Sequence, residues 1–270
     1  TLETVIQGHQ RETLDARYVK NVILKLVDKP PRVPSWLAQP KKGHSLPGVP
    51  SLLLSDLHWG EVVRPEEIGG VNAYNLEIAH QRMRKLVDTT MSLLTQYVVN
   101  PDYPGIILNL GGDMVSGDIH EELSQTNEIP IMPAVLDLWG VLIWAIEQFK
   151  GRFGRVFIPC VTGNHGRNTR KPRAKHRHWT SFDWLLYQML AKRFEADPDV
   201  TFFIPDGPDA LYSVYGHRYL LTHGDQFRGG DGQIGAIGPL TRGNKRKLAR
   251  NTATQQEYDT MLCGHWHQYM

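Results

Sequence analysis

The sequence has few cysteines, no long apolar run and little net charge, and each of these absences excludes a class of protein. With only Cys160 and Cys263 in 270 residues, the chain cannot be a disulfide-rich secreted scaffold. Both cysteines stand in apolar runs, so we expect buried, unpaired thiols. No run of about 18 apolar residues is present, and we therefore expect neither a membrane span nor a membrane partner. The formal net charge of +2 indicates no particular partner.

Other common signals are missing as well. The first residues lack the basic, apolar and small-residue pattern of a secretory signal, which, together with the unpaired cysteines, favours a cytoplasmic protein. The chain has no internal repeat and no low-complexity tract. Residues 224–238 are rich in glycine but lack the Gly-x-x-x-x-Gly-Lys-Ser/Thr pattern, so we expect a flexible loop there rather than a phosphate-binding loop.

Residues 1–50 differ in composition from the rest of the chain. Residues 1–29 are heavily charged and have a helical pattern, whereas residues 30–50 contain six prolines, which cannot continue a helix. The sequence therefore predicts a charged helical arm and a Pro-rich linker over residues 1–50. A single globular domain is expected over residues 51–270.

Short apolar runs alternate with segments of helical periodicity from residue 51 onward. The first half of this region reads as β–α–β units and the second half as rich in strands. This alternation predicts an α/β fold with two packed sheets flanked by helices. The expected strands are 51–54, 105–110, 155–161, 201–204, 211–215, 218–222 and 260–263. The expected helices are about 72–99 with Asn72 as N-cap, 133–150 with Gly151 as C-cap, and 181–195.

Side chains that can bind metals follow five of the expected strands. Taken singly, each block is more simply explained as a turn, a cap or a hydrogen-bonded core histidine. Five such blocks, each directly after an apolar strand, are not explained in that way, because loops at strand ends are where α/β proteins place their sites. The blocks are Asp56-Leu57-His58, Gly112-Asp113, Gly163-Asn164-His165, His223-Gly224-Asp225 and Gly264-His265-Trp266-His267.

The chemistry of these side chains indicates the kind of metal. Carboxylate oxygen, amide oxygen and imidazole nitrogen together suit divalent manganese, iron or zinc, and argue against a Cys-rich structural zinc site. Seven candidate ligands are too many for one tetrahedral ion and suit two ions that share one bridging carboxylate.

In this order the five blocks resemble the motifs of the calcineurin-like metallophosphoesterases, a superfamily that includes SbcD-type nucleases, phosphodiesterases and Ser/Thr phosphatases. The resemblance covers roughly residues 51–267 and implies two packed mixed β-sheets flanked by helices, a four-layer sandwich. It also implies two divalent metal ions, with manganese expected first and iron or zinc as alternatives. The implied roles are Asp56, His58 and His267 on the first ion, Asn164, His223 and His265 on the second, Asp113 bridging both, and His165 as general acid.

The sequence departs from the family pattern in three places. Ser116 and Gly166 stand where the family usually has acids, and the acid expected to orient His165 is therefore missing. Asp118 and Asp225 are candidates to replace it. The chain ends three residues after His267, where the family normally continues with further strands, so we expect a longer natural protein.

Two basic runs lie beside the motifs and bear on the substrate. Basic grooves with aromatic side chains suit a nucleic-acid backbone, and Trp59 and Trp179 are candidate stacking platforms. We therefore predict a nuclease-like phosphodiesterase that acts on nucleic acid. The alternatives are a phosphomonoesterase acting on phosphoprotein or a small nucleotide, and a non-catalytic metal- or nucleic-acid-binding module. The candidate contacts are Arg167, Arg170, Lys171, Arg173, Lys175 and Arg177 in the first run, and Lys245, Arg246 and Lys247 in the second, which also holds Arg242 and Arg250.

Overall fold

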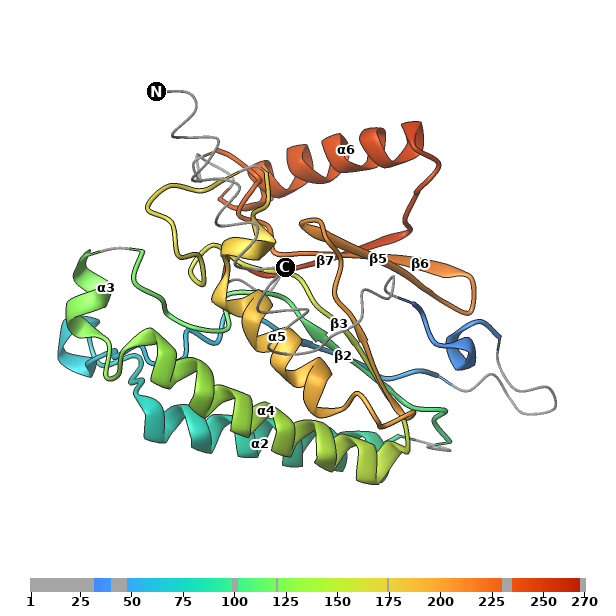
Figure 1. The fold of residues 1–270 in the computed structure, drawn as a ribbon, viewed down its shortest axis with the longest axis horizontal. Helices are drawn as coiled ribbons and strands as arrows, with labels where there is room; N and C mark the ends of the chain where they lie inside the picture. Colours follow the sequence, from blue (N-terminus) through green and yellow to red (C-terminus); the bar gives the residue numbers. More distant parts are fainter. Residues whose placement is uncertain are drawn as a thin grey trace.

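The computed structural model describes residues 32–39, 48–98, 102–119, 121–173, 175–229 and 235–267. The predicted helical arm over residues 1–29 lies outside the described residues, as does part of the predicted linker. The described chain forms an α/β fold, as the sequence predicts, with one sheet of four strands and one of three (Figure 1).

The larger sheet is parallel throughout, whereas mixed sheets were expected. Its strand order is β1-β2-β3-β4, and each strand pairs in parallel with the next. Parallel neighbours need a crossover connection, and helices supply one between each pair of strands. The strands are β1 (Ser51–Leu54), β2 (Ile106–Leu110), β3 (Val156–Pro159) and β4 (Val200–Phe203). The crossovers carry α2 (Leu76–Gln96), then α3 (Glu121–Thr126) and α4 (Ile131–Phe153), then α5 (Phe182–Arg193).

The smaller sheet is mixed. In it, β5 (Asp209–Val214) and β6 (His217–Thr222) form an antiparallel hairpin, and β7 (Thr260–Cys263) lies parallel to β6. The connection from β6 to β7 contains α6 (Ile237–Ala253). In Figure 1, α2 and α4 lie along one side of the molecule and α6 lies on the other, beyond the smaller sheet.

Two predicted helices have ends in the structure that differ from the predicted ones. Asn75, not Asn72, caps α2, and its Oδ1 accepts a hydrogen bond of 2.8 Å from the backbone N of Ile78. The predicted C-cap Gly151 lies inside α4, which ends at Gly154, where φ is 77°.

Two helices, α3 and α6, were not predicted. The beginning of α6 falls within the glycine-rich stretch that we expected to be a loop, and the helix itself contains Gly238, Pro239 and Gly243. Gly243 has a packing role, because a Cβ there would lie 2.2 Å from a ring carbon of Phe227. The proline falls in the first turn, where a helix tolerates it.

Two hydrophobic clusters hold the layers together. Helices α2, α4 and α5 pack on one face of the larger sheet and bury most of the apolar residues. The second cluster lies between the two sheets, where Ile107 and Phe157 meet Ala210 and Leu221. Leu37, from the predicted linker, is fully buried in this second cluster, so part of that segment packs onto the domain. Cys160 is buried and Cys263 is half-buried, and both are unpaired, as predicted.

Among the described residues, α4 is the one helix long and apolar enough to cross a membrane by length and composition, with a mean hydropathy of 1.4 over its most apolar window. Its inner face carries Leu138, Leu142, Ile146 and Phe149, which are all buried in the larger cluster. One such helix is weak evidence for a membrane span, because a mostly buried core helix passes the same test; 33% of this window is buried.

Candidate metal centre

The loops that follow β1, β2, β3, β6 and β7 bring all eight predicted site residues to one edge of the sheets. Parallel strands end at the same edge, which explains why blocks so far apart in the sequence meet. Three overlapping groups of ligand atoms result, and within each group the atoms lie within 4.8 Å of one another. The first group is Asp56, His58 and His267, the second is Asp113, His223 and His265, and the third is His58, Asp113 and His165.

The first group joins the loop after β1 to the loop after β7. His267 Nε2 lies 3.3 Å from His58 Nε2 and 3.3 Å from Asp56 Oδ1. The backbone N of His265 donates to both carboxylate oxygens of Asp56, at 2.9 and 3.0 Å. Asp56 therefore ties the ends of the two sheets together as well as offering an oxygen ligand.

The second group centres on His223, which is almost fully buried. Its Nδ1 donates to the carbonyl oxygen of Gly111 at 2.9 Å, so its Nε2 is the nitrogen that faces the site. That Nε2 lies 2.9 Å from Asp113 Oδ2 and 3.2 Å from Asn164 Oδ1. Metal-binding histidines usually donate their second ring nitrogen to a carbonyl or a carboxylate, and His223 has this arrangement.

The loops that follow β1, β2, β3, β6 and β7 hold the predicted ligands and are called the ligand loops. Their backbone is strained. Eight non-glycine residues in the described chain have positive φ, and five of them are predicted ligands. L-residues adopt this left-handed conformation at a cost, and such residues gather at functional sites. The five ligands are Asp56 (φ 56°), His58 (47°), Asp113 (50°), His265 (72°) and His267 (49°).

Glycines beside the ligands allow the loops to approach this closely. A Cβ at Gly163 would lie 2.0 Å from Asp113 Oδ1, and one at Gly264 would lie 2.2 Å from Asp56 Oδ2. Neither position can hold a side chain without moving a carboxylate. The glycines of the sequence motifs are therefore required by the close packing of the ligand loops.

The electrostatics favour the metal-binding form in some of the predicted ligands but not in all. Burial, followed by the nearby His165, lowers the pKa of His58 to about 4, and burial also lowers the pKa of His265. Both histidines are then neutral near pH 7, which is the form that binds metals.

Burial acts to raise the pKa of Asp113, but the hydrogen bond with His223, the charges of His223 and His165 and the backbone N–H of His165 together outweigh burial and hold that pKa below the ordinary value. Burial acts to lower the pKa of His223, but its hydrogen bond with Asp113 and the nearby carboxylate charges raise that pKa to about 9. The hydrogen bond with Asp56 raises the pKa of His267.

The donor set fits divalent cations. It combines imidazole nitrogens, two carboxylates and one amide oxygen in overlapping groups, and this mixture is what manganese, iron and zinc accept. Asp113 and His58 each belong to two of the three groups, and of these two only Asp113 offers a carboxylate. Asn164 joins the second group through its contact with His223.

His165 is held by backbone groups. Its Nδ1 donates to the carbonyl oxygen of Ser116 at 2.9 Å, and its backbone N donates to Asp113 Oδ1 at 2.7 Å. This carbonyl takes the orienting role for which the sequence offered Asp118 or Asp225. Asp225 accepts instead from Arg177 at 2.7 Å, and Asp118 is exposed to solvent.

Two residues that support the site were not identified from the sequence. Asp183, at the start of α5, is fully buried and accepts hydrogen bonds from the backbone of two ligand loops. Burial, and then the charge of Asp113, raises the pKa of Asp183 to about 6. Asp137 on α4 was missed as well. Both residues stand inside helical patterns, where the sequence marks neither as different from a surface acid.

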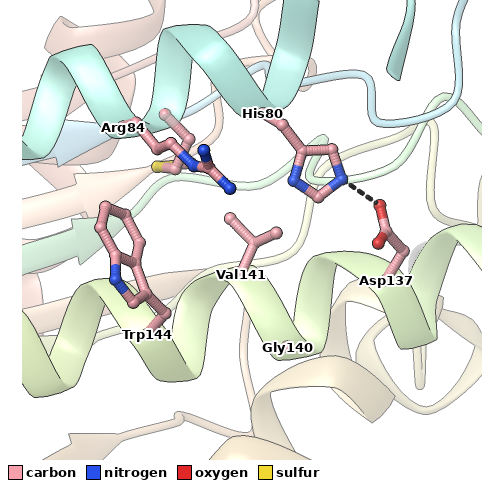
Figure 2. Close-up of a pocket in the computed structure, with 7 residues that line it drawn as sticks. His80, Arg84, Asp137, Gly140, Val141 and Trp144 are labelled. Carbon is pink, nitrogen blue, oxygen red and sulfur yellow. Dashed lines mark hydrogen bonds and ion pairs between the residues drawn. The ribbon is translucent and has the colours of Figure 1, made fainter. Parts of the chain in front are cut away.

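Asp137 connects the loop after β1 to the helical layer. One of its oxygens, Oδ2, accepts a hydrogen bond of 2.7 Å from Trp59 Nε1 and lies 2.9 Å from His80 Nε2. Figure 2 shows the contact with His80 in a groove between α2 and α4, about 280 Å³ in volume, with Arg84 and Trp144 at its other end. Trp59 is almost fully buried, so the expectation that it stacks on nucleic-acid bases is wrong.

The basic residues divide into two sets. Three of them are committed to the protein itself, because Arg167 donates to the carbonyl oxygen of Asn164, Arg177 pairs with Asp225, and the buried Lys247 pairs with Asp209. Arg173 is half-buried. The exposed set is Arg170, Lys171 and Lys175 after β3, and Arg242, Lys245, Arg246 and Arg250 on α6, where Arg250 also contacts Asp209.

Comparisons with known proteins neither add to nor contradict this description. A scan against models of known protein families gave no match, and a search of curated proteins gave none either. The candidate metal centre therefore rests on the sequence motifs and the geometry described above.

Proposed function

We propose that the chain is a metal-dependent hydrolase that cleaves phosphodiester bonds, with nucleic acid as its substrate. The convergence of five strained ligand residues on one edge of the sheets carries this proposal. Asp and His adopt left-handed backbone more readily than most residues. Five of the eight non-glycine residues with positive φ in the described chain are nevertheless predicted ligands, as expected if these side chains are aimed at bound ions.

The proposal assigns two divalent ions to the overlapping groups, manganese first and iron or zinc as alternatives. Asp56, His58 and His267 would hold one ion, and Asn164, His223 and His265 the other, with Asp113 shared. The proposal also includes a finer description of the fold, as the four-layer sandwich of the calcineurin-like metallophosphoesterases. The two packed sheets, with helices α2, α4 and α5 outside one and α6 outside the other, support that description.

Two bound divalent cations would supply Lewis acidity, which offsets charge on the phosphoryl oxygens and lowers the pKa of water. The chain itself positions the reacting groups. Asp113 accepts the backbone N–H of His165, so the bridging carboxylate and the catalytic histidine move as one unit.

His165 is assigned to protonate the leaving oxygen. Because its Nδ1–H is directed to the carbonyl oxygen of Ser116, proton exchange with the substrate takes place at Nε2. The ring lies 4.4 Å from that of His58, centroid to centroid, so the proposed acid stands directly beside a proposed ligand. A positioned general acid contributes about 10²–10⁴-fold to such a reaction.

The exposed basic residues support a nucleic-acid substrate. Arg170, Lys171 and Lys175 continue the chain directly from the block that contains Asn164 and His165. The cations of α6 lie between the motifs of His223 and His265 in the sequence. Both runs are therefore tied to ligand loops, where they can neutralise backbone phosphates on either side of the scissile bond.

The test is hydrolysis by the purified chain with Mn²⁺. The substrates are end-labelled single- and double-stranded DNA, bis-p-nitrophenyl phosphate and p-nitrophenyl phosphate. We expect cleavage of DNA and of the diester, abolished by a chelator and by Asp113→Ala. Turnover of the monoester alone would make the chain a phosphatase, and Mn²⁺ binding without any turnover would reject the enzymatic proposal.

A further inference from the structure

Asp183 is a buried carboxylate that contacts two ligand loops at once. Its Oδ2 accepts hydrogen bonds from the backbone N of Asp113 at 3.1 Å and from the backbone N of Gly163 at 2.9 Å. Its Oδ1 accepts from the backbone N of Met114 at 3.2 Å. One side chain thus joins the loop after β2 to the loop after β3, and its own exposure is zero.

These three N–H groups need an acceptor that the sheet does not provide. β2 ends at Leu110 and β3 at Pro159, so the donors lie beyond the strand ladder. The two loops also lie against each other, because a Cβ at Gly112 would be 2.4 Å from the backbone N of Gly163. A carboxylate can accept several hydrogen bonds in so small a space, and a buried donor without a partner is costly.

The position of Asp183 on α5 makes this contact possible. It is the second residue of the helix, where the positive end of the helix dipole favours a negative charge. The backbone N of Phe182 donates to the carbonyl oxygen of Gly166 at 2.7 Å and fixes the start of the helix beside the loop of His165. A Cβ at Gly166 would lie 2.7 Å from Asp183 Oδ1, so the glycine leaves room for the carboxylate.

We propose that Asp183 is a positioning residue for the metal centre: it sets the spacing between Asp113 and the block of Asn164 and His165. This inference rests on the proposed function, since it assumes that these residues hold metal ions. All three of these hydrogen bonds to Asp183 come from backbone N–H groups, and none comes from the side chain of a predicted ligand. Such supporting groups change metal affinity or activity by about 10–100-fold when they are removed.

The variants are chosen to separate positioning from general stability. Asp183→Asn keeps the shape of the side chain but replaces one acceptor oxygen with a donor that faces other donors. Tyr187→Phe is the matched control, because Tyr187 lies one turn further along α5, is fully buried, and donates to the carbonyl oxygen of Val161 at 3.0 Å. It removes the hydrogen bond to Val161 and an interaction with the backbone of Gly112, but leaves the N–H groups of Asp113, Met114 and Gly163 with their acceptor.

A relocation variant tests whether the carboxylate itself matters. The double variant combines Asp183→Ala with Gly166→Asp, so that residue 166 supplies the carboxylate. In the wild type, a Cβ at Gly166 would lie 2.7 Å from Asp183 Oδ1, so the new side chain starts close to the original carboxylate. If the three N–H groups need a carboxylate at this place, the double variant recovers part of the Mn²⁺ affinity that Asp183→Ala loses. If Asp183 only fills space, adding a second bulky residue recovers nothing.

The measurement is Mn²⁺ titration by calorimetry, with the electron paramagnetic resonance signal of a spin-coupled manganese pair as a second readout. Thermal unfolding in chelator reports stability without metal. We expect Asp183→Asn to weaken at least one Mn²⁺ site by about 10–100-fold and to lose the coupled signal, while Tyr187→Phe keeps both. Equal Mn²⁺ binding by the wild type and Asp183→Asn would overturn the inference.

The remaining outcomes also decide the matter. A wild type that binds two Mn²⁺ but hydrolyses no phosphate ester rejects the proposed function, while the titration of Asp183→Asn still tests the inference. A wild type that binds no Mn²⁺ overturns both. Should the single variants fail to fold, the double variant has to fold and bind Mn²⁺, and its failure would overturn the inference.

Discussion

Left-handed backbone has different reasons in the turn between β5 and β6 and in the ligand loops. In the hairpin between β5 and β6, Tyr215 (φ 51°) and Gly216 (φ 87°) form the two-residue turn. A two-residue hairpin turn of type I′ has positive φ at both central residues, and it matches the twist of the paired strands. In the ligand loops no antiparallel ladder imposes positive φ, yet five predicted ligands have it.

The two regions differ in what holds the backbone in this conformation. The hairpin turn is held by the pairing of its strands, and the identity of its residues affects only stability. The ligand loops are held by many separate contacts, including the close approaches at Gly163 and Gly264 and the hydrogen bonds of Asp183. Each left-handed L-residue costs about 1–2 kcal/mol. We infer that these contacts exist to aim the donor side chains.

The largest effect is expected at the shared ligand. Asp113→Ala and Asp113→Gly should both abolish Mn²⁺ binding and reduce hydrolysis to background, because Asp113 contributes to two of the three ligand groups. Calorimetry and DNA cleavage give the measurement. Asp113→Gly should unfold at a higher temperature than Asp113→Ala in chelator, since glycine adopts φ 50° without strain. The opposite order of stability would show that this backbone is not strained.

The next effect separates catalysis from metal binding. His165→Ala should keep Mn²⁺ binding, because His165 is outside the proposed ligand set, and should lower the rate of DNA cleavage by about 10²–10⁴-fold. The loss should be much smaller with bis-p-nitrophenyl phosphate, whose leaving group needs no proton. An equal loss with both substrates would remove the general-acid role and indicate a role in binding the phosphoryl group.

The sequence was most informative where chemistry and periodicity coincide. An apolar run that is followed by Asp, Asn or His indicates where a strand ends. A parallel sheet then brings those strand ends to one edge. For this reason all eight predicted site residues meet in the structure. The α2 and α4 helices were found from their apolar faces, with their ends displaced by three or four residues, because Asn72 and Gly151 carry the same local signals as the true caps, Asn75 and Gly154.

Where the sequence failed, a tertiary contact overrode a local signal. Gly243 indicates a loop by propensity, but it is required by the ring of Phe227, so α6 was missed. Asp183 resembles an ordinary acid in the first turn of a helix, and its burial depends on loops that are up to 70 residues away along the chain. Trp59 follows the predicted ligand His58, but its indole is almost fully buried and donates to Asp137.

A smaller effect tests which surface contacts the substrate. Removing two exposed cations of α6, in Lys245→Ala with Arg246→Ala, should weaken DNA binding and reduce the slope of log affinity against log salt by about 1–2. Removing Arg84 and Lys85, which are exposed on α2 at the other side of the molecule, changes the net charge equally and should leave the slope unchanged. Equal slopes in the two double variants would exclude α6 as the contact surface.

The smallest effect is expected in the hairpin, where the left-handed residue has no part in the site. Tyr215→Asn places a residue that tolerates positive φ beside Gly216 and completes the Asn-Gly pair that such turns prefer. Its backbone N still donates to the carbonyl oxygen of Leu37. Relief of backbone strain, less the lost packing of a half-buried ring, should raise the free energy of unfolding by about 0.5 kcal/mol. Denaturant unfolding measures this gain, while Mn²⁺ affinity and DNA cleavage should stay at the wild-type level; a change in either would mean that the hairpin and the ligand loops are coupled.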